Sequence, residues 1–476
     1  MKICATTFLT HFVTGFAMKR RCILFTGTAL MTTTLSLISL LLPVVAQAET
    51  FTIDFNKAVE MANNADHRIG EKEKQVAVAE GLLQEAQGAK SWIFDTNTFL
   101  GMSPKIRSAD YIKDNGEIDR SALDFAGVGP WLKLDFTVVK PITTFGKVEH
   151  YSEAARNNIL LKQGDVQVQR GKTYIDVATA YNGFLAARDL RLLLEDARDK
   201  VHSALDLTKE WLEADNGQAK QSDQYALETG AAIIEGYLEE AGGTEKVAMA
   251  GLRMLTGIAD ADQLAVADKR LEAWPLPDAK LKPMMAKALS QRPEMAQVSA
   301  GLAARRALLE ANRSEAYPNI YYGIGGLVSY SPLRESTADL SVYDSFNTWG
   351  ATPVIGMKWD WYSGRQRAKV AQAQAEYDVV LETKAFALQG IPFQVAEAFH
   401  NVHLNYEKVQ RLYNGARSGR RWLIATYADF EAGIEQSDKL TAAFQGYLLA
   451  YSEYVKSVNN YNVELAKLRV AIGDVK

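Results

Sequence analysis

Two long helical stretches, about 148–213 and 366–430, limit what this chain can fold into more than any other feature of its sequence. Their apolar residues recur at intervals of three and four, which is the spacing of coiled-coil helices. About 65 residues of α-helix span about 100 Å, so neither stretch can fold back within an ordinary globular domain. The two shorter helices that flank each long one add up to nearly 90 Å. The sequence therefore predicts a tall helical wall, in which two short helices stacked end to end lie beside one long helix.

The same order of elements occurs twice, with a period of roughly 215–225 residues, which indicates two tandem repeats. Each repeat reads as a first helix, two strands, the long helix, a turn and a medium helix. The first helices are expected at about 67–90 and 293–315, and the medium helices at about 223–257 and 438–473. Four motifs recur in the same order: Leu83–Ala86 with Leu308–Ala311, Thr144–Lys147 with Tyr362–Arg365, Gln221–Asp223 with Gln436–Asp438, and Ala250–Gly257 with Ala466–Gly473.

These motifs divide the chain into a first repeat over 49–258 and a second over 283–476. Residues 259–282 join the two repeats, and Pro275 and Pro277 in this segment are typical of an extended connection. We therefore expect a strap, rather than a further domain, between the repeats.

Four segments of about 10–13 residues, the length of a tilted membrane-spanning strand, read as β-strands. They lie at about 91–101, 130–142, 317–328 and 353–362. The fourth alternates, with Ile355, Met357, Trp359 and Trp361 on one face and Gly356, Lys358 and Asp360 on the other. An apolar face toward lipid and a polar face toward a lumen is the pattern of membrane β-barrels. In the second strand either face could be the apolar one, because Leu132 to Val138 alternate well but the repeat alignment favours the other frame.

Four strands are too few to close a barrel, since closed membrane barrels begin at about eight. An open sheet edge is not tolerated in lipid, where its backbone groups would stay unpaired. Several copies of the chain must therefore pool their strands, and strand count alone allows a dimer, a trimer or a tetramer. The long polar connections at about 102–129 and 328–352 lie at one end of the strands, as external loops of such barrels do.

The first 48 residues are expected to be a signal peptide. A positive region at Lys19–Arg21 precedes an apolar stretch, and Ala46-Gln47-Ala48 forms a cleavage site; Met18 would begin a conventional signal by itself. Both cysteines, Cys4 and Cys22, lie in this segment, so no disulfide or cysteine metal ligand is expected beyond it. No later segment has the run of about 18 apolar residues that a membrane helix needs. The net charge of −4 also argues against nucleic acid as a partner.

Catalytic and cofactor motifs are missing from the sequence, which contains no nucleophile elbow, P-loop or dinucleotide fingerprint. His400 and His403 have the i, i+3 spacing that can hold a metal on a helix, but no acidic or cysteine ligands cluster near them. We therefore expect no catalytic residue, no cofactor and no metal site.

The sequence resembles the TolC-like outer-membrane efflux protein family over nearly its whole length. The motifs that carry the resemblance are Arg292–Met295, Glu315–Pro318, Tyr362–Arg365, Gly433 to Asp438, and Tyr461-Asn462 with Ala466 and Leu468. The resemblance implies a homotrimer whose twelve-stranded barrel in the outer-membrane lipid continues into a periplasmic α-helical barrel. It also implies docking to a periplasmic adaptor and an inner-membrane transporter, with a closed gate at the periplasmic tip.

By the same resemblance, the turns at about 213–222 and 430–437 are the periplasmic tips, with Gly217 and Gly433 in the tight turns and Ser222 and Ser437 beside them. Family members often narrow the pore with acidic residues just after the second tip. Asp438 matches that position, with Asp223 its repeat mate and Glu435 nearby. The chain has one acid where some members have two, and capping of the following helix is the alternative role for both aspartates.

The function predicted from these features is that of an exit duct in a tripartite export system. The duct would carry substrates across the outer membrane from an inner-membrane pump and its adaptor. The alternative is a non-channel periplasmic coiled-coil adaptor, which would share the signal and long helices but would not need four amphipathic strands. The sequence leaves the cargo open between drugs, metals and proteins.

Overall fold

The computed structural model describes residues 50–105, 115–116, 127–214, 217, 219–334, 343–361 and 363–475. The chain divides into two units, Met1–Gln47 and Ala48–Lys476, and every described element belongs to the second. The expected signal peptide and its cleavage site lie outside the described residues.

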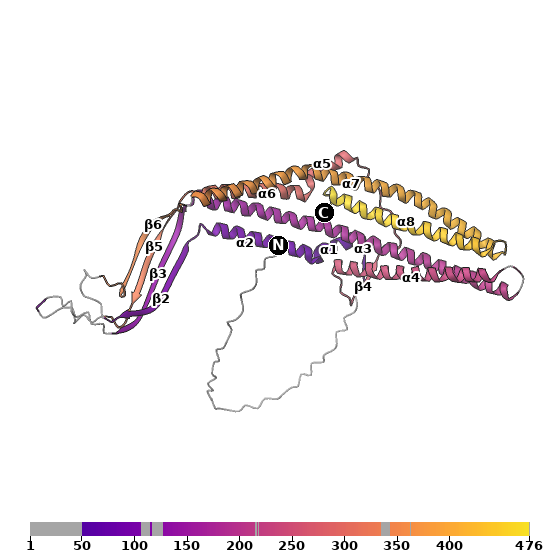
Figure 1. Cartoon of the computed structure of the whole chain (residues 1–476), viewed down its shortest axis with the longest axis horizontal. Helices are drawn as coiled ribbons and strands as arrows, with labels where there is room; N and C mark the ends of the chain where they lie inside the picture. Colours follow the sequence, from indigo (N-terminus) through magenta and orange to yellow (C-terminus); the bar gives the residue numbers. More distant parts are fainter. Residues whose placement is uncertain are drawn as a thin grey trace, which may run out of the picture. The chain divides into compact units, whose positions relative to one another are not determined.

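Six helices build an elongated wall within the second unit (Figure 1). The first repeat supplies α2 (His67–Gly88), α3 (Lys147–Glu213) and α4 (Gln221–Thr256). The second supplies α6 (Pro293–Ser314), α7 (Ser363–Glu431) and α8 (Ser437–Ala471). In each repeat the two short helices run end to end beside the long one, as the sum of their lengths predicts.

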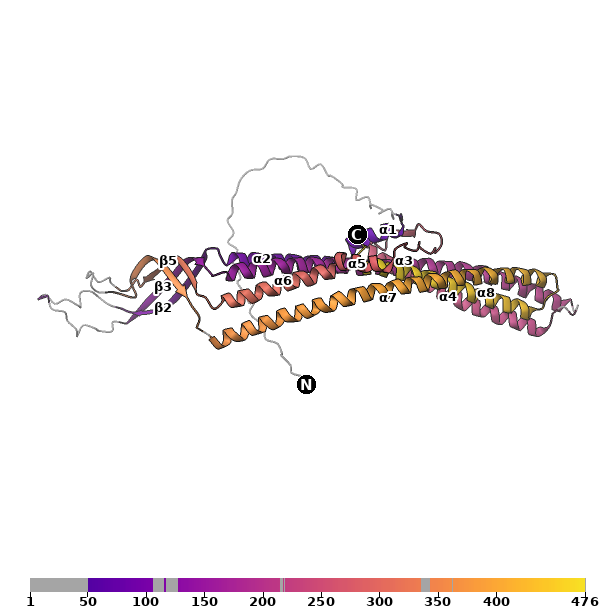
Figure 2. The same ribbon diagram turned by 90° about the horizontal axis from the view of Figure 1, so that it is seen from above.

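The helices are arranged as four columns, in which a short stack and a long helix alternate. The α2/α4 stack packs on α3, α3 packs on the α6/α8 stack, and that stack packs on α7. Figure 2 shows α6 between α3 and α7. One outer edge of the wall is therefore a short stack and the other is the long helix α7, which contains Pro392.

Two buried clusters hold the columns together. The larger one surrounds Tyr181, Val395 and Tyr461, and the second surrounds Leu227, Phe430 and Leu440 nearer the tips. Both clusters draw on α3 and on the helices of the second repeat. The apolar spacing of the long helices thus serves packing between the repeats as well as within each one.

Four elements were missed in the sequence, namely β1 (Thr50–Ile53), α1 (Phe55–Ala65), β4 (Gln263–Val266) and α5 (Leu281–Gln291). β1 and β4 form a parallel two-stranded sheet, although they are far apart in sequence. β4 is thus a short extended strand inside the segment 259–282, which the sequence predicted as a connecting strap. Strands of four residues carry too little alternation to be recognised without their partner.

The segment after β4 is tied to α3 and α8 by buried side chains. The Asn462 amide nitrogen donates to the carbonyl oxygen of Glu272 at 2.8 Å and to the side-chain oxygen of Asn182 at 2.8 Å. Its own side-chain oxygen accepts the Trp274 N–H at 2.9 Å. On α3, Asp189 accepts the Leu271 N–H at 2.9 Å, and burial raises the pKa of this carboxyl. The connection thus joins the long helix of one repeat to the medium helix of the other.

At one end of the wall the chain forms a four-stranded sheet of β2 (Ile93–Pro104), β3 (Val128–Thr143), β5 (Asn319–Tyr330) and β6 (Thr348–Lys358). All neighbours are antiparallel in the order β2-β3-β5-β6, so two hairpins, one from each repeat, pair through β3 and β5. β2 and β6 are the edge strands, and their outer backbone groups have no partner strand among the described residues.

The fourth strand was predicted too far along the chain. It begins at Thr348 and ends at Lys358, so Trp359 and Trp361 lie in the connection to α7 rather than in the strand. The indole N–H of Trp359 donates to the Ala316 carbonyl oxygen at 3.1 Å, and the two indoles pack with their centroids 4.2 Å apart. The alternation of Trp359 and Trp361 thus continues past the point where ladder pairing stops. No helix of the described residues combines the length and the hydropathy of a membrane-spanning segment.

Candidate channel site

The register of the sheet gathers most of its large apolar side chains on one face. Residues paired directly across antiparallel strands point to the same side, so the partners of Ile355 and Met357 identify their face. Ile355 pairs with Tyr322 and Met357 with Ile320. Following the ladders places on this apolar face Phe94, Leu100, Met102, Leu132, Leu134, Phe136, Val138, Ile320, Tyr322, Ile324, Val328, Tyr330, Trp349, Ile355 and Met357.

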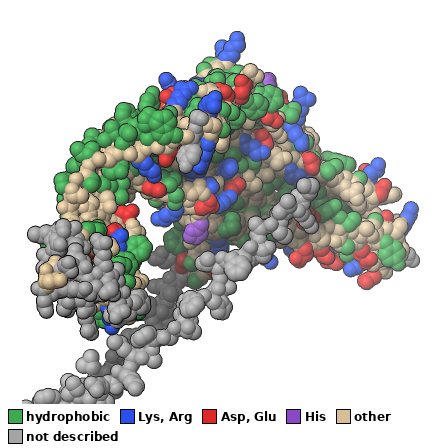
Figure 3. Space-filling view, turned by 60° about the vertical axis from the view of Figure 1, so that its left-hand side comes forward, with side chains coloured by type: hydrophobic (Ala, Val, Ile, Leu, Met, Phe, Trp, Pro, Cys, Tyr) green, Lys and Arg blue, Asp and Glu red, His purple; other side chains and the backbone are tan. Residues whose placement is uncertain are grey.

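This register settles the frame of the second strand. The face of Ile355 also carries Leu132, Leu134, Phe136 and Val138. The simple alternation of the second strand therefore predicted its apolar face correctly, and the repeat alignment was misleading. The apolar face is also open: Ile355 is 81% exposed, Leu100 83% and Trp349 85%. Hydrophobic side chains gather over the sheet in Figure 3, whereas charged side chains are frequent over the helices. An apolar surface of this kind needs a covering, and lipid is the covering that an alternating strand pattern indicates.

The opposite face carries charged, hydroxyl and glycine residues together with fewer apolar ones, such as Phe99, which pairs with Lys133. Lys133 and Asp135, two residues apart on β3, form an ion pair of 2.9 Å. Thr137 and Asp95 follow on the same side, and Asp95 pairs with Thr137 in the β2–β3 ladder. We call this surface the polar face of the sheet.

The polar face runs into a cavity of about 1270 Å³ between the sheet and the helices. Asp95, Thr137 and Lys358 from the strands line it, together with Tyr151 of α3 and Arg305 of α6. The sheet's polar face and the sides of α3 and α6 that line this cavity therefore form one continuous surface. A duct built from this chain would have this surface as its lining.

Three side chains from both repeats meet where the sheet joins the helices. The Tyr151 hydroxyl donates to Glu315 at 3.0 Å, and the Lys369 ammonium donates to the other oxygen of that carboxylate at 3.1 Å. Burial raises the pKa of Glu315, but the bonds from Lys369 and Tyr151 outweigh it, so that the pKa lies below its usual range. Burial beside Glu315 raises the pKa of Tyr151 to about 12. The junction is thus fixed by a charged link between α3, the C-cap residue of α6 and α7.

At the opposite end of the wall, each repeat makes a tight turn at a glycine. Gly217 and Gly433 both have φ of 72°, in the left-handed region that favours glycine. Both are exposed, and each lies between a long helix and a medium helix. The geometry is that of a helical hairpin end, and its role as a periplasmic tip stays a prediction.

Asp223 links the two hairpin ends. Its carboxylate accepts the Lys220 N–H at 2.8 Å, which is one half of a capping box at the start of α4. Its other oxygen accepts the hydroxyl of Ser437, a buried residue of the second repeat, at 2.7 Å. The capping role is therefore present at Asp223, together with a bond between repeats that the sequence did not predict. The repeated Gln-Ser-Asp motif was the available signal, but it does not say which serine meets which aspartate.

Asp438 has a different environment from its repeat mate. Gln436 occupies the N-cap position of α8, and Asp438 accepts only the adjacent Lys439 N–H at 2.8 Å. Asp438 is exposed, and so is Ser222, the repeat mate of Ser437. Glu435 is half-buried, and its N–H donates to the Asp429 carbonyl oxygen at 3.2 Å. The second hairpin end thus presents an acid without a partner from the first repeat, which leaves its predicted gating role open.

The histidine pair has ordinary helical surroundings. Nδ1 of His403 lies 2.9 Å from the carbonyl oxygen of Phe399, and the two rings pack with centroids 4.1 Å apart. Within the described ranges, no group of three or more His, Asp or Glu side chains is arranged to hold a metal ion.

Residues 284–474 match the family model described as outer membrane efflux protein. The matched range is the second repeat, and the structural likeness below extends the same fold over the first. No curated relative matches the chain in sequence.

Solved structures share the fold at low sequence identity. A membrane protein from Pseudomonas aeruginosa is 17% identical, with a TM-score of 0.70 over 88% of this chain and 93% of that one. The Campylobacter jejuni CmeC outer membrane channel is 15% identical, with a TM-score of 0.67 over 88% and 85%. The Neisseria gonorrhoeae MtrE outer membrane channel, in its open state, is 16% identical, with a TM-score of 0.65 over 88% of both chains.

The family match over the second repeat, and the fold shared with outer membrane channels, agree with the predicted exit duct of the outer membrane that extends into the periplasm. That the apolar sheet face meets lipid stays a prediction. The expectations of fold class, function and location are confirmed at this level.

Proposed function

We propose that three copies of this chain form one export duct of a tripartite system. The observation that carries the proposal is the four-stranded sheet, which has one apolar face and two edges that no other described strand pairs with. In lipid, every backbone group must be paired, so β2 of one copy has to meet β6 of the next. Three copies close a barrel of twelve strands, which is the choice that the family resemblance favours among eight, twelve and sixteen.

The helical wall supports the same closure. Inside the chain, the long helix α3 packs on the α6/α8 stack. If copies are arranged in a ring, α7 of one meets the α2/α4 stack of the next and repeats that packing. Both edges expose apolar side chains for the contact: Phe386, Phe393 and Leu404 on α7 are 76%, 68% and 68% exposed, and Val78, Val247 and Met254 on α2 and α4 are 65%, 73% and 74% exposed.

The partners that we propose are a periplasmic adaptor and an inner-membrane transporter, which would meet the helical end of the duct. Asp438 is our first candidate for the closed gate, followed by Asp223 and Glu435. Three exposed copies of Asp438 around a symmetric opening would repel one another and attract cations. The bond from Ser437 gives Asp223 a structural role as well, so its effect on the gate should be smaller.

We propose no catalytic activity, because the described surfaces serve as lining, lipid contact and packing. The coiled-coil adaptor reading accounts for the long helices only. It leaves the exposed apolar face of the sheet without a purpose, and the channel is therefore favoured.

Planar-bilayer recording of the purified oligomer tests the proposal. We expect discrete conductance steps from an oligomer that resists SDS until it is boiled. A protein that fractionates as soluble in the periplasm and gives no conductance would refute the proposal, and would favour the adaptor.

A further inference from the structure

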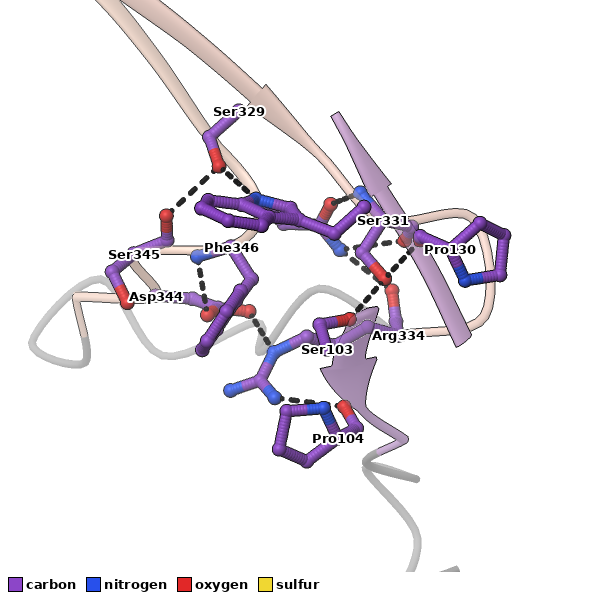
Figure 4. A network of polar contacts seen from close by, with 11 residues as sticks. Ser103, Pro104, Pro130, Ser329, Ser331, Arg334, Asp344, Ser345 and Phe346 are labelled. Atoms are coloured by element: carbon purple, nitrogen blue, oxygen red, sulfur yellow. Dashed lines mark hydrogen bonds and ion pairs between the residues drawn. The ribbon is translucent and has the colours of Figure 1, made fainter. Parts of the chain in front are cut away.

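The connection between β5 and β6 folds back over the polar face of the sheet at the end far from the helices (Figure 4). Its described parts are residues 331–334 and 343–347. Ser329 belongs to the polar face because it pairs with Lys133, and Trp131 belongs to it because it lies two residues before Lys133 on β3. The Trp131 indole N–H donates to the Ser329 hydroxyl at 2.7 Å, and that hydroxyl donates to the Ser345 carbonyl oxygen at 2.9 Å. The connection is thus bonded to the lining side of the sheet and not to its lipid side.

An ion pair closes the base of this connection. The Arg334 guanidinium and the Asp344 carboxylate are 2.6 Å apart, and their side chains are only 12% and 11% exposed. Arg334 also donates to the Pro104 carbonyl oxygen of β2 at 3.0 Å. Its guanidinium lies 4.9 Å from the centre of the Phe346 ring, which packs edge-on against Trp131 at 5.3 Å. The Arg334–Asp344 pair therefore joins the two ends of the connection to each other. It also joins them to the edge strand β2 and to the packed rings of Phe346 and Trp131.

The backbone of the connection is fixed as closely as its side chains. Asn347 accepts the Ser331 N–H at 2.7 Å and donates to the Arg334 carbonyl oxygen at 2.7 Å. The hydroxyls of Ser103 and Ser331 are 2.6 Å apart and buried. At Gly129 of β3, an added Cβ would lie 3.0 Å from the Cβ of Leu333, so the connection rests directly on the polar face of this strand.

We propose that these contacts form a latch that narrows the external mouth of the duct and sets the size of solute that passes. The proposal rests on the duct function proposed above. The side chains of the latch stand on the lining face, so each copy brought into a closed barrel reduces the free cross-section at its outer end. The buried ion pair holds this narrowing in place, because either partner alone would be left charged and without a counter-ion.

The test uses the full oligomer with Asp344→Asn and, separately, Arg334→Gln. Losing one partner of a buried pair shifts the latched-to-open balance by roughly a hundredfold or more. We expect a higher single-channel conductance and faster liposome swelling with large maltodextrins, while maltose entry changes little. Tyr343→Ala is the matched control, since Tyr343 lies in the same connection but is 73% exposed. An unchanged conductance and size limit in both variants, in oligomers that still resist SDS, would overturn the proposal.

A cysteine pair gives an independent measurement if those variants fail to assemble. Ser103→Cys with Ser331→Cys should form a disulfide in the assembled oligomer, because the two hydroxyls already touch. Both native cysteines lie within the first 22 residues, so no other thiol in the folded unit interferes. We expect the cross-linked channel to keep the wild-type size limit and to restore it in Asp344→Asn. Thiols that stay reduced under oxidation would refute the latch. A wild-type oligomer that does not conduct would instead contradict the duct function itself.

Discussion

Arginine at Ile355 tests which face of the sheet meets lipid. Ile355 is 81% exposed on the apolar face and lies three residues from the end of β6 at Lys358. That distance is about 10 Å along the strand, or roughly 8 Å above the inner rim of an apolar band about 25 Å tall once the strand tilt is included. At this depth an arginine costs about 1–3 kcal/mol, between the values for the midplane and the interface. The lost isoleucine contributes about 1–2 kcal/mol more, so the expected cost is about 2–5 kcal/mol per chain.

Thr352→Arg is the control for this prediction. Thr352 is on the same strand and exposed, but it pairs with Gly325 on the polar face. It also lies nearer the middle of the strand, so it would cost more than Ile355→Arg if the frame were reversed. Gly356 is unsuitable as a control, because an added Cβ would lie 2.4 Å from the Tyr321 ring.

The assay is denaturant unfolding of the oligomer in lipid vesicles, with heat-modifiable migration as the check on assembly. We expect Ile355→Arg to lose about 2–5 kcal/mol per chain and Thr352→Arg to lose less than about 1 kcal/mol. Equal costs, or a larger cost at Thr352, would show that the apolar face does not meet lipid.

Three further predictions concern the helical region. Asp438→Asn should weaken the block of the channel by divalent cations on the periplasmic side more than Asp223→Ala does, as single-channel recording will show; an unchanged block would remove Asp438 from the gate. Asn462→Ala should lower the free energy of unfolding by about 2–5 kcal/mol, because it leaves several buried backbone and amide groups unpaired, and a loss below about 1 kcal/mol in denaturant titration would contradict this. The bonds from Lys369 and Tyr151 hold the folded-state pKa of Glu315 below that of an ordinary glutamate. The link to Lys369 therefore stabilises the fold above the ordinary glutamate pKa and is lost as the pH falls through the lower folded-state pKa. Thermal unfolding as a function of pH should therefore show a smaller acid-induced loss in Glu315→Gln, and equal losses would count against the link.

The helical wall could be predicted from the sequence because length alone excludes most alternatives. Helices as long as α3 and α7 cannot pack into a compact globular domain. The sequence also predicted where both helices begin and end to within a few residues. Local patterns were also sufficient for the existence of the four membrane strands. The end of β6 was misplaced because Trp359 and Trp361 continue the alternation, and only cross-strand pairing shows where a ladder stops.

Features that depend on partners distant in sequence were not predictable. The frame of β3 became clear only when Val138 was seen opposite Ile324. The bond from Ser437 to Asp223 joins two copies of one motif, and the motif says nothing about how the copies face each other. The latch at Arg334 and Asp344 lies in a segment that reads simply as a polar loop, because an ion pair across a loop leaves no periodic signal.

Native mass spectrometry of the detergent-extracted protein, carried out on the same sample that is recorded in bilayers, tests the central claim most directly. Four strands with two free edges cannot stand alone in lipid, so the account predicts a complex of three chains that conducts. A stable conducting monomer, or a conducting complex of two or four chains, would contradict it.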